Sequence, residues 1–300
     1  LKAEGREILD LTIGEPDFDT PEHIKDAAIA AIKRGDTKYT PVNGILPLRQ
    51  AIAVKLKQRT GHAYDPGCIT VGGGAKQIIL LALTATLDPG SEVIIPAPYW
   101  ASSPDMLAGT AGTPVTVTCP QSQQFKLTAA QVEAAITPKT RWLILNTPSN
   151  PTGIAYSGDE LRAIAAVLVK HPHVGVLTDE IYDELWYEPG AIASLVQLAP
   201  QLADRVLLVN GVSKTYAMTG WRIGYAAGPQ SLIDAINVLQ SQSSSCPSSI
   251  SQQAALAALT GPQASVGEYA GAYARRRDLA IDLLNAIPDI SCVRPSGAFY

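Results

Sequence analysis

The stretch of sequence that most constrains this fold is residues 210–225, NGVSKTYAMTGWRIGY. It follows a short apolar run, so it begins where a buried strand would end. It places one lysine, Lys214, directly after Ser213, and Arg222 follows eight residues later. A lysine in this setting can hold an aldehyde cofactor as an imine, while the hydroxyl and the guanidinium can bind the cofactor's phosphate. The stretch therefore suggests amino-acid chemistry and predicts further site residues elsewhere in the chain.

The rest of the chain alternates strand-like and helix-like segments. Five short runs rich in Val, Ile and Leu are continuously apolar, as expected for strands covered on both faces. They are residues 92–96, 114–118, 141–146, 174–179 and 205–210. Helical patterns lie over residues 75–87, 158–170 and 231–240, with a start signal at 158–160 and a stop signal at 88–90. This alternation predicts an α/β fold with helices on both faces of a mainly parallel sheet.

Composition and charge limit the possible classes. The chain has 300 residues, 46% hydrophobic and 17% charged, enough for a large core and about two domains. A net charge of -4 without a basic run argues against nucleic-acid binding, and no apolar run approaches the roughly 18 residues of a membrane span. Four scattered cysteines without a CxxC pair predict buried free thiols in a reducing cytoplasm, with no disulfide or metal site. The first residues are too charged for a signal peptide, and both ends of the sequence look cut.

Polar clusters directly follow three of the predicted strands, at residues 146–150, 179–182 and 211–214. Ligands of open α/β sheets bind beyond the carboxyl ends of the strands. We therefore expect these clusters to meet at one edge of the sheet. A Ser/Gln-rich patch at residues 241–251 is better interpreted as a connecting loop than as part of the site.

Lys214 needs a depressed pKa to act as a nucleophile, because a free lysine amine has a pKa of about 10.4. Burial and neighbouring cations such as Arg222 and Lys76 would lower it. Alone, Lys214 would be an ordinary surface lysine. A glycine-rich turn, GGGAK at 72–76, precedes a predicted helix and can bind an anion through backbone N–H groups. It lacks the spacing of a Walker loop, and taken by itself it would be only a turn.

Asp179 lies at the inner end of a predicted buried strand, where a carboxylate needs a partner. A protonated ring nitrogen would be such a partner, and Tyr182 could donate to a phenolic oxygen. The simpler role for Asp179 is a helix N-cap, which is compatible with the first. Asn150 lies in a Pro-rich turn, NTPSNPTG at 146–153, whose X-Pro bonds can be cis, and Trp100 can stack on a planar ring. The simpler interpretations are a tight loop and a core tryptophan.

In these motifs the chain resembles the class I and II aminotransferases, pyridoxal-phosphate enzymes of fold type I, and within them the bacterial aspartate aminotransferase branch. The resemblance extends along essentially the whole chain. Its motifs are GEPDFDTP (14–21), KYTPVNG (38–44), GAKQ (74–77), PYW (98–100), SNPTG (149–153), DEIY (179–182), the 210–225 stretch and RRRD (275–278).

The resemblance implies a role for each motif. Lys214 would form the imine and then shuttle the proton, Asp179 would pair with the pyridine nitrogen, and Tyr182 and Asn150 would contact the phenolic oxygen. Trp100 would stack on the ring. The phosphate would be surrounded by Gly74, Ala75, Lys76, Ser213 and Arg222. Gly14 would lie beside the substrate's α-carboxylate, with Trp100 and Asn150 nearby.

The resemblance also implies a homodimer, in which Tyr39 reaches the phosphate of the partner subunit. It implies a three-layer large domain over residues 45–285. Residues 1–44 (an N-terminal arm and small-domain portion) and 286–300 would belong to an incomplete smaller α/β domain. The arginine for the α-carboxylate is expected beyond Tyr300. Gly73 stands where the family often has Asn, a change expected to affect loop stiffness more than chemistry.

The expected reaction is a ping-pong transfer of an amino group between an L-amino acid, aspartate by branch resemblance, and a 2-oxo acid such as 2-oxoglutarate. An aromatic or prephenate aminotransferase, or a lyase or decarboxylase on the same site, stays open. A non-catalytic pyridoxal-phosphate-binding regulatory domain is a remote alternative, because the sequence shows no basic footprint for nucleic acid.

Overall fold

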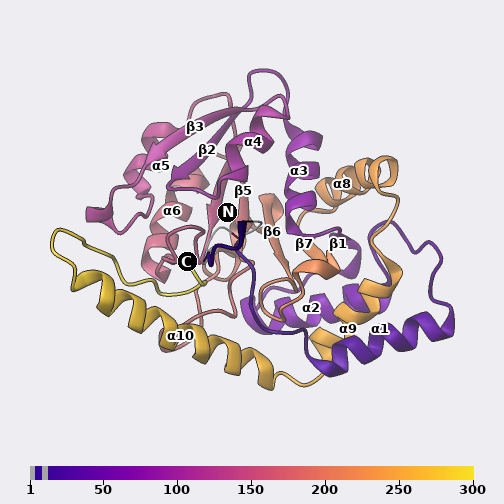
Figure 1. Ribbon diagram of the computed structural model, residues 1–300. Helices are drawn as coiled ribbons and strands as arrows, with labels where there is room; N and C mark the ends of the chain where they lie inside the picture. Colours follow the sequence, from indigo (N-terminus) through magenta and orange to yellow (C-terminus); the bar gives the residue numbers. More distant parts are fainter. Residues whose placement is uncertain (1–3, 9–12) are drawn as a thin grey trace.

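A seven-stranded sheet forms the centre of the molecule (Figure 1). The structure is a computed structural model that describes residues 4–8 and 13–300, so part of the expected 1–44 segment lies outside it. The strand order is β1-β7-β6-β5-β4-β2-β3. Strands β2 to β6 pair in parallel, whereas β7 runs antiparallel to β1 and β6. The strand bounds are β1 (Ile69–Gly72), β2 (Glu92–Ala97), β3 (Thr113–Thr118), β4 (Thr140–Asn146), β5 (Gly175–Asp179), β6 (Val206–Gly211) and β7 (Gly224–Ala227).

Helices cover both faces of this sheet. One face packs against α3, α4 and α8, and the other against α1, α2, α5, α6, α7 and α9. A long helix, α10, crosses the lower edge of the view in Figure 1. The helix bounds are α1 (Glu22–Arg34), α2 (Leu46–Thr60), α3 (Ala75–Thr86), α4 (Ser102–Ala108), α5 (Ala129–Ala135), α6 (Gly158–Lys170), α7 (Leu195–Leu198), α8 (Gln230–Ser243), α9 (Ser249–Thr260) and α10 (Ala264–Asn285).

Alternate side chains of the central strands enter two separate cores. In β4, Leu143 and Leu145 belong to the core under α2 and α6, whereas Trp142 and Ile144 belong to the core under α3 and α4. A strand buried on both faces must be apolar at every position, which is why its sequence does not alternate. The predicted three-layer α/β fold with a mainly parallel sheet is confirmed.

The elements predicted from the sequence agree closely with the structure. All five predicted strands are confirmed to within one residue at each end. The predicted helix at 158–170 is confirmed, and its start carries a capping box in which Ser157 and Glu160 satisfy each other's backbone N–H groups. For β3 the expectation of burial on both faces was wrong. This strand lies at the sheet edge, so Thr113, Thr116 and Thr118 are exposed.

Two smaller expectations also need correction. The Ser/Gln-rich patch 241–251 is mostly helical, because α8 continues to Ser243 and α9 begins at Ser249. Of the four cysteines, all free thiols, only Cys119 is fully buried, while Cys68, Cys246 and Cys292 are half-buried. Within the described residues, no helix is both long and apolar enough to span a membrane.

The sheet brings the three predicted polar clusters to one edge. Asn146 at the end of β4 pairs in register with Asp179 at the end of β5, and β6 ends beside them at Gly211. On the far side of β6, the short strand β7 lies directly under the start of α3. A methyl group at Gly224 would lie only 2.2 Å from the backbone nitrogen of Ala75. The glycine therefore lets β7 approach the turn that opens α3.

We predict that Gly224→Ala lowers the free energy of unfolding by about 1–3 kcal/mol, because backbone cannot yield easily to an added methyl group. Urea denaturation measures the change. Gly267→Ala in α10 is the matched control, since a methyl group there has no neighbour within 4 Å among the described residues. Equal stability of Gly224→Ala and the parent would contradict the prediction.

Candidate active site

A cleft of about 730 Å³ lies at the carboxyl ends of β4, β5 and β6. Most of the residues predicted from the sequence line it: Gly14, Ala75, Lys76, Trp100, Asn150, Asp179, Tyr182, Ser213, Lys214 and Arg222. Gly74 lies directly beside it, because a methyl group on Gly74 would be 2.5 Å from Nη2 of Arg222. Tyr39 is not among the lining residues, and its side chain is 88% exposed. One chain thus assembles the whole predicted set except Tyr39.

Lys214 projects from the loop after β6 and is half-buried. Its Nζ donates a hydrogen bond of 2.5 Å to the carbonyl oxygen of Gly14 and lies 5.4 Å from the centre of the Phe299 ring. Burial lowers the pKa of Lys214, and Arg222 and Lys76 lower it further, against the opposing charges of Glu15 and Asp179. The direction is the one that nucleophilic chemistry requires.

Asp179 ends β5 and is buried. Its Oδ1 accepts a hydrogen bond of 3.2 Å from the N–H of Ile181. Burial raises the pKa of Asp179 to about 7, and the neighbouring carboxylates of Glu180 and Asp183 also raise it, while the Ile181 hydrogen bond and Lys214 lower it. The residues directly after Asp179 form a short turn and not an α-helix, so Asp179 is not a helix N-cap. The carboxylate lacks full compensation, and a cation in the cleft would supply it.

Tyr182 lies on that turn, with its hydroxyl 3.0 Å from the hydroxyl of Tyr300. Burial raises the pKa of Tyr182, as does the Tyr300 hydroxyl, while a hydrogen bond with the Asn150 side chain lowers it. The Asn150 backbone is held by a hydrogen bond of 2.6 Å to Oδ1 of Asn146. Both X-Pro bonds of this turn, Thr147-Pro148 and Asn150-Pro151, are cis. Tyr182 and Asn150 can therefore act on one acceptor in the cleft.

The glycine-rich turn and Arg222 form a cationic end of the cleft. Gly74 has a φ of +102°, a conformation that favours glycine, and α3 begins at the next residue. Nη2 and Nη1 of Arg222 donate to the carbonyl oxygens of Gly73 and Thr219 at 3.0 and 3.1 Å. The first N–H groups of a helix lack partners within it, so this end suits an anion.

Trp100 packs against the core under α3 and presents its ring to the cleft. Nζ of Lys76 lies 4.7 Å from the centre of that ring. Among the described residues Lys76 pairs with no carboxylate, in contrast to Arg222, which is bound to two carbonyl oxygens. Lys76 is therefore a cation that a substrate can use.

Glu15 and Tyr300 are among the lining residues that were not predicted from the sequence. Glu15 accepts a hydrogen bond from the Thr219 hydroxyl and opposes the lowering of the Lys214 pKa. Tyr300 packs so closely on Gly14 that a methyl group there would lie 2.2 Å from its hydroxyl. Glu15 stands in the GEPDFDTP motif noted for the resemblance, which was the available signal for it.

Residues 6–300 match the family "Aminotransferase class I and II". The chain belongs to this family. It is similar to an aspartate aminotransferase of Rhizobium meliloti (strain 1021), with 53% identity over 100% of this chain and 73% of that protein. It is also 53% identical to an aspartate/prephenate aminotransferase of Cereibacter sphaeroides, over 100% of this chain and 75% of the relative.

Solved aminotransferase structures share the fold. The aspartate aminotransferase of Rhizobium meliloti superimposes with a TM-score of 0.97 at 52% identity, covering 99% of this chain and 74% of that one. The enzyme of Thermus thermophilus with maleate gives 0.95 at 43% identity, covering 99% and 77%. The chain is a pyridoxal-phosphate-dependent aminotransferase of fold type I.

The residues of this cleft fit pyridoxal 5′-phosphate. An anion site at the start of α3, beside Arg222, suits the phosphate. Asp179, a buried carboxylate without full compensation, suits a protonated ring nitrogen, and the amine of Lys214 lines the same cleft. Within the described residues, no group of three or more His, Cys, Asp or Glu side chains is placed to hold a metal ion.

We predict that Asp179→Asn stabilises the cofactor-free chain at neutral pH but not near pH 4. The folded pKa of about 7 exceeds the unfolded value of 3.8, so the stability present below pH 4 is lost as pH rises towards 7. Three pKa units correspond to about 4 kcal/mol, an upper bound for the gain at pH 8. Urea denaturation from pH 4 to pH 8 measures it, and a difference that does not change with pH would contradict the assignment.

Proposed function

We propose that this aminotransferase moves an amino group from aspartate to 2-oxoglutarate in a ping-pong cycle, with Lys214, Asp179 and Tyr182 as its catalytic residues. The observation that carries the proposal is the position of Lys214. Its half-buried amine, with a lowered pKa, lines one cleft together with a buried carboxylate and an anion site. No observation favours a lyase or decarboxylase reaction at the same site.

Each lining residue has a physical task in this proposal. When bound, pyridoxal phosphate supplies an electron sink beside the substrate's Cα. Lys214 Nζ takes the Cα proton as general base and then delivers it as general acid, which its lowered pKa permits. Asp179 holds a proton on the ring nitrogen through its charge, and Tyr182 and Asn150 donate to the phenolic oxygen. Gly74, Ala75, Lys76, Ser213 and Arg222 would hold the phosphate, Trp100 would stack on the ring, and Gly14 would lie beside the substrate's α-carboxylate.

A preference for a dicarboxylic substrate has its own support. The relatives quoted above are named aspartate or aspartate/prephenate aminotransferases, and the Thermus thermophilus structure contains maleate. A second carboxylate needs a cation, and Lys76 presents one beside the Trp100 ring. Lys76 can thus serve the substrate side chain as well as the phosphate. The name of the Cereibacter sphaeroides relative keeps prephenate as an alternative acceptor.

The assembly and the domain division are also part of this proposal. We expect a homodimer in which Tyr39 reaches the partner's phosphate site, and the 88% exposure of its side chain in one subunit supports this. Residues 45–285 would form the large domain, because all strands of the central sheet lie between 69 and 227. Residues 1–44 and 286–300 would belong to the smaller domain, and the enzyme would act in the cytoplasm.

Lys214→Ala should abolish transamination and the visible absorbance band of the bound cofactor, because it removes the half-buried amine that lines the cleft with Asp179. Turnover and the absorbance spectrum measure the two effects. Lys139→Ala, a change of an exposed lysine far along the chain, is the control. Full turnover by Lys214→Ala would refute its role.

Lys76→Met should lower kcat/KM for aspartate about 10- to 100-fold, the value of one charge-assisted hydrogen bond, with a much smaller effect on an aromatic amino acid. Steady-state kinetics with both donors and 2-oxoglutarate measure the ratio, with Lys139→Met as the control. Equal losses for the two donors would place Lys76 at the phosphate alone and remove this support for aspartate.

A further inference from the structure

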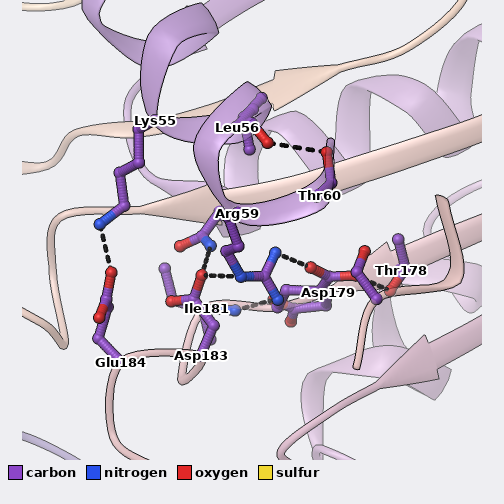
Figure 2. A network of polar contacts seen from close by, with 12 residues as sticks. Lys55, Leu56, Arg59, Thr60, Thr178, Asp179, Ile181, Asp183 and Glu184 are labelled. Atoms are coloured by element: carbon purple, nitrogen blue, oxygen red, sulfur yellow. Dashed lines mark hydrogen bonds and ion pairs between the residues drawn. The ribbon is translucent and has the colours of Figure 1, made fainter. Parts of the chain in front are cut away.

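Behind the cleft, two cations of α2 lie against the turn that carries Asp179 and Tyr182 (Figure 2). Nε of Arg59 lies 2.9 Å from Oδ2 of Asp183, and its Nη1 pairs with Oε2 of Glu180. One helical turn away, Nζ of Lys55 lies 2.5 Å from Oε1 of Glu184. The turn after β5 is thus tied to α2 by its carboxylates.

The Arg59 pairs are buried, whereas the Lys55 pair is at the rim. The side chains of Glu180 and Asp183 are 0% and 1% exposed and that of Arg59 is 13% exposed, but Glu184 is 36% exposed. Neutral donors also contact the two carboxylates. The hydroxyls of Thr178 and Ser194 donate to Glu180 Oε1 at 2.9 and 3.1 Å, and Asn210 donates to Asp183 Oδ2 at 2.8 Å. These donors come from β5, β6 and the start of α7.

Three buried carboxylates therefore crowd into five residues of sequence, 179–183, and one guanidinium contacts two of them. Like charges oppose each other's ionisation strongly in a buried setting. The charges of Glu180 and Asp183 both raise the pKa of Asp179. If the positive charge that balances these two carboxylates were removed, the pKa of Asp179 in the cleft would rise further. Arg59 is not among the residues that line the cleft.

We propose that Arg59 is a positioning residue for the reaction, which neutralises Glu180 and Asp183 so that Asp179 stays ionised, and which holds the turn that carries Tyr182. The inference rests on the role proposed above for Asp179. Arginine suits the task because its rigid fork can bind two carboxylates at once and it does not lose its proton.

Of the groups around this network, Arg59 makes the ion pairs with Glu180 and Asp183. The network is also surrounded by Lys55 and by three tyrosines, Tyr64, Tyr216 and Tyr225. Burial raises the pKa of each tyrosine hydroxyl, so the three phenols stay neutral. Lys55 is the remaining cation there; its charge also lowers the pKa of Asp183, but its hydrogen bond goes to Glu184 and not to Asp183 or Glu180. Asp179 itself also faces Lys214, Tyr182 and Tyr300 on the cleft side, and these are not altered by changes in α2.

The test uses the full chain loaded with pyridoxal 5′-phosphate. Five proteins are compared with the parent: Arg59→Met, Arg59→Lys, Glu180→Gln, the double variant Arg59→Met/Glu180→Gln, and Asp179→Asn. Lys57→Met is the matched control, because it removes one positive charge from an exposed position of the same helix. The dissociation constant for pyridoxal 5′-phosphate and the pH dependence of kcat and KM are measured for each.

Arg59→Met should weaken pyridoxal 5′-phosphate binding about tenfold or more, lower kcat with little change in KM, and move the acid limb of the kcat profile upward by about one pH unit. The sign follows because a higher pKa of Asp179 leaves it protonated up to a higher pH. Arg59→Lys should lose less, since it keeps the charge. The double variant should recover towards the parent, because Glu180→Gln removes a charge that Arg59 no longer balances.

The inference is overturned if Arg59→Met binds the cofactor and titrates like Lys57→Met, or if the double variant is no better than Arg59→Met. A purely structural role for Arg59 predicts the second result, since it gives no charge-dependent recovery. If Arg59→Met does not fold, Arg59→Lys and the double variant decide by the same measurements. Asp179→Asn separates the two proposals: full activity there refutes the role of Asp179, whereas its loss beside an unchanged Arg59→Met refutes only the role of Arg59.

Discussion

A buried negative charge at the end of β5 is the constraint on which most of this site depends. A carboxylate removed from water must be paired or lose its charge. Asp179 meets this demand in two directions, towards the cleft, where Lys214 and a ring cation can face it, and away from it, where Arg59 balances its acidic neighbours. The groups in the cleft and the ion pairs behind Asp179 therefore act on the same property, the ionisation of the Asp179 carboxylate.

The sheet topology brings residues that are distant in sequence together at the site. Parallel strands β4, β5 and β6 end at one edge, so three loops separated by tens of residues meet there. The antiparallel strand β7 adds a close contact at Gly224 that places the start of α3, with its anion site, beside the same edge. A small shift of any of these elements would separate the amine of Lys214 from the groups that tune it.

Much of this was predictable because the signals were local. Continuous apolar runs identified the five parallel strands, and residues 158–160 marked the start of α6. The strand β7 was not predicted, since it has only four residues and begins with glycine. The exposure of β3 also could not be predicted, because threonine occurs in both buried and exposed strands. Only the strand order shows that β3 lies at an edge of the sheet.

The family and the cofactor could be predicted from the chain alone, and Lys214 could be singled out as the candidate imine lysine, because the motif around Lys214 and the polar residues after each strand are short-range patterns. Only the tertiary structure decided which cation balances which carboxylate. Arg59 lies 120 residues before Asp179 on an unremarkable helix, and nothing in its local sequence distinguishes it from Lys57. Its partners are set by the position of α2 beside the turn that follows β5, and the strength of each charge pair depends on the distance that this packing fixes.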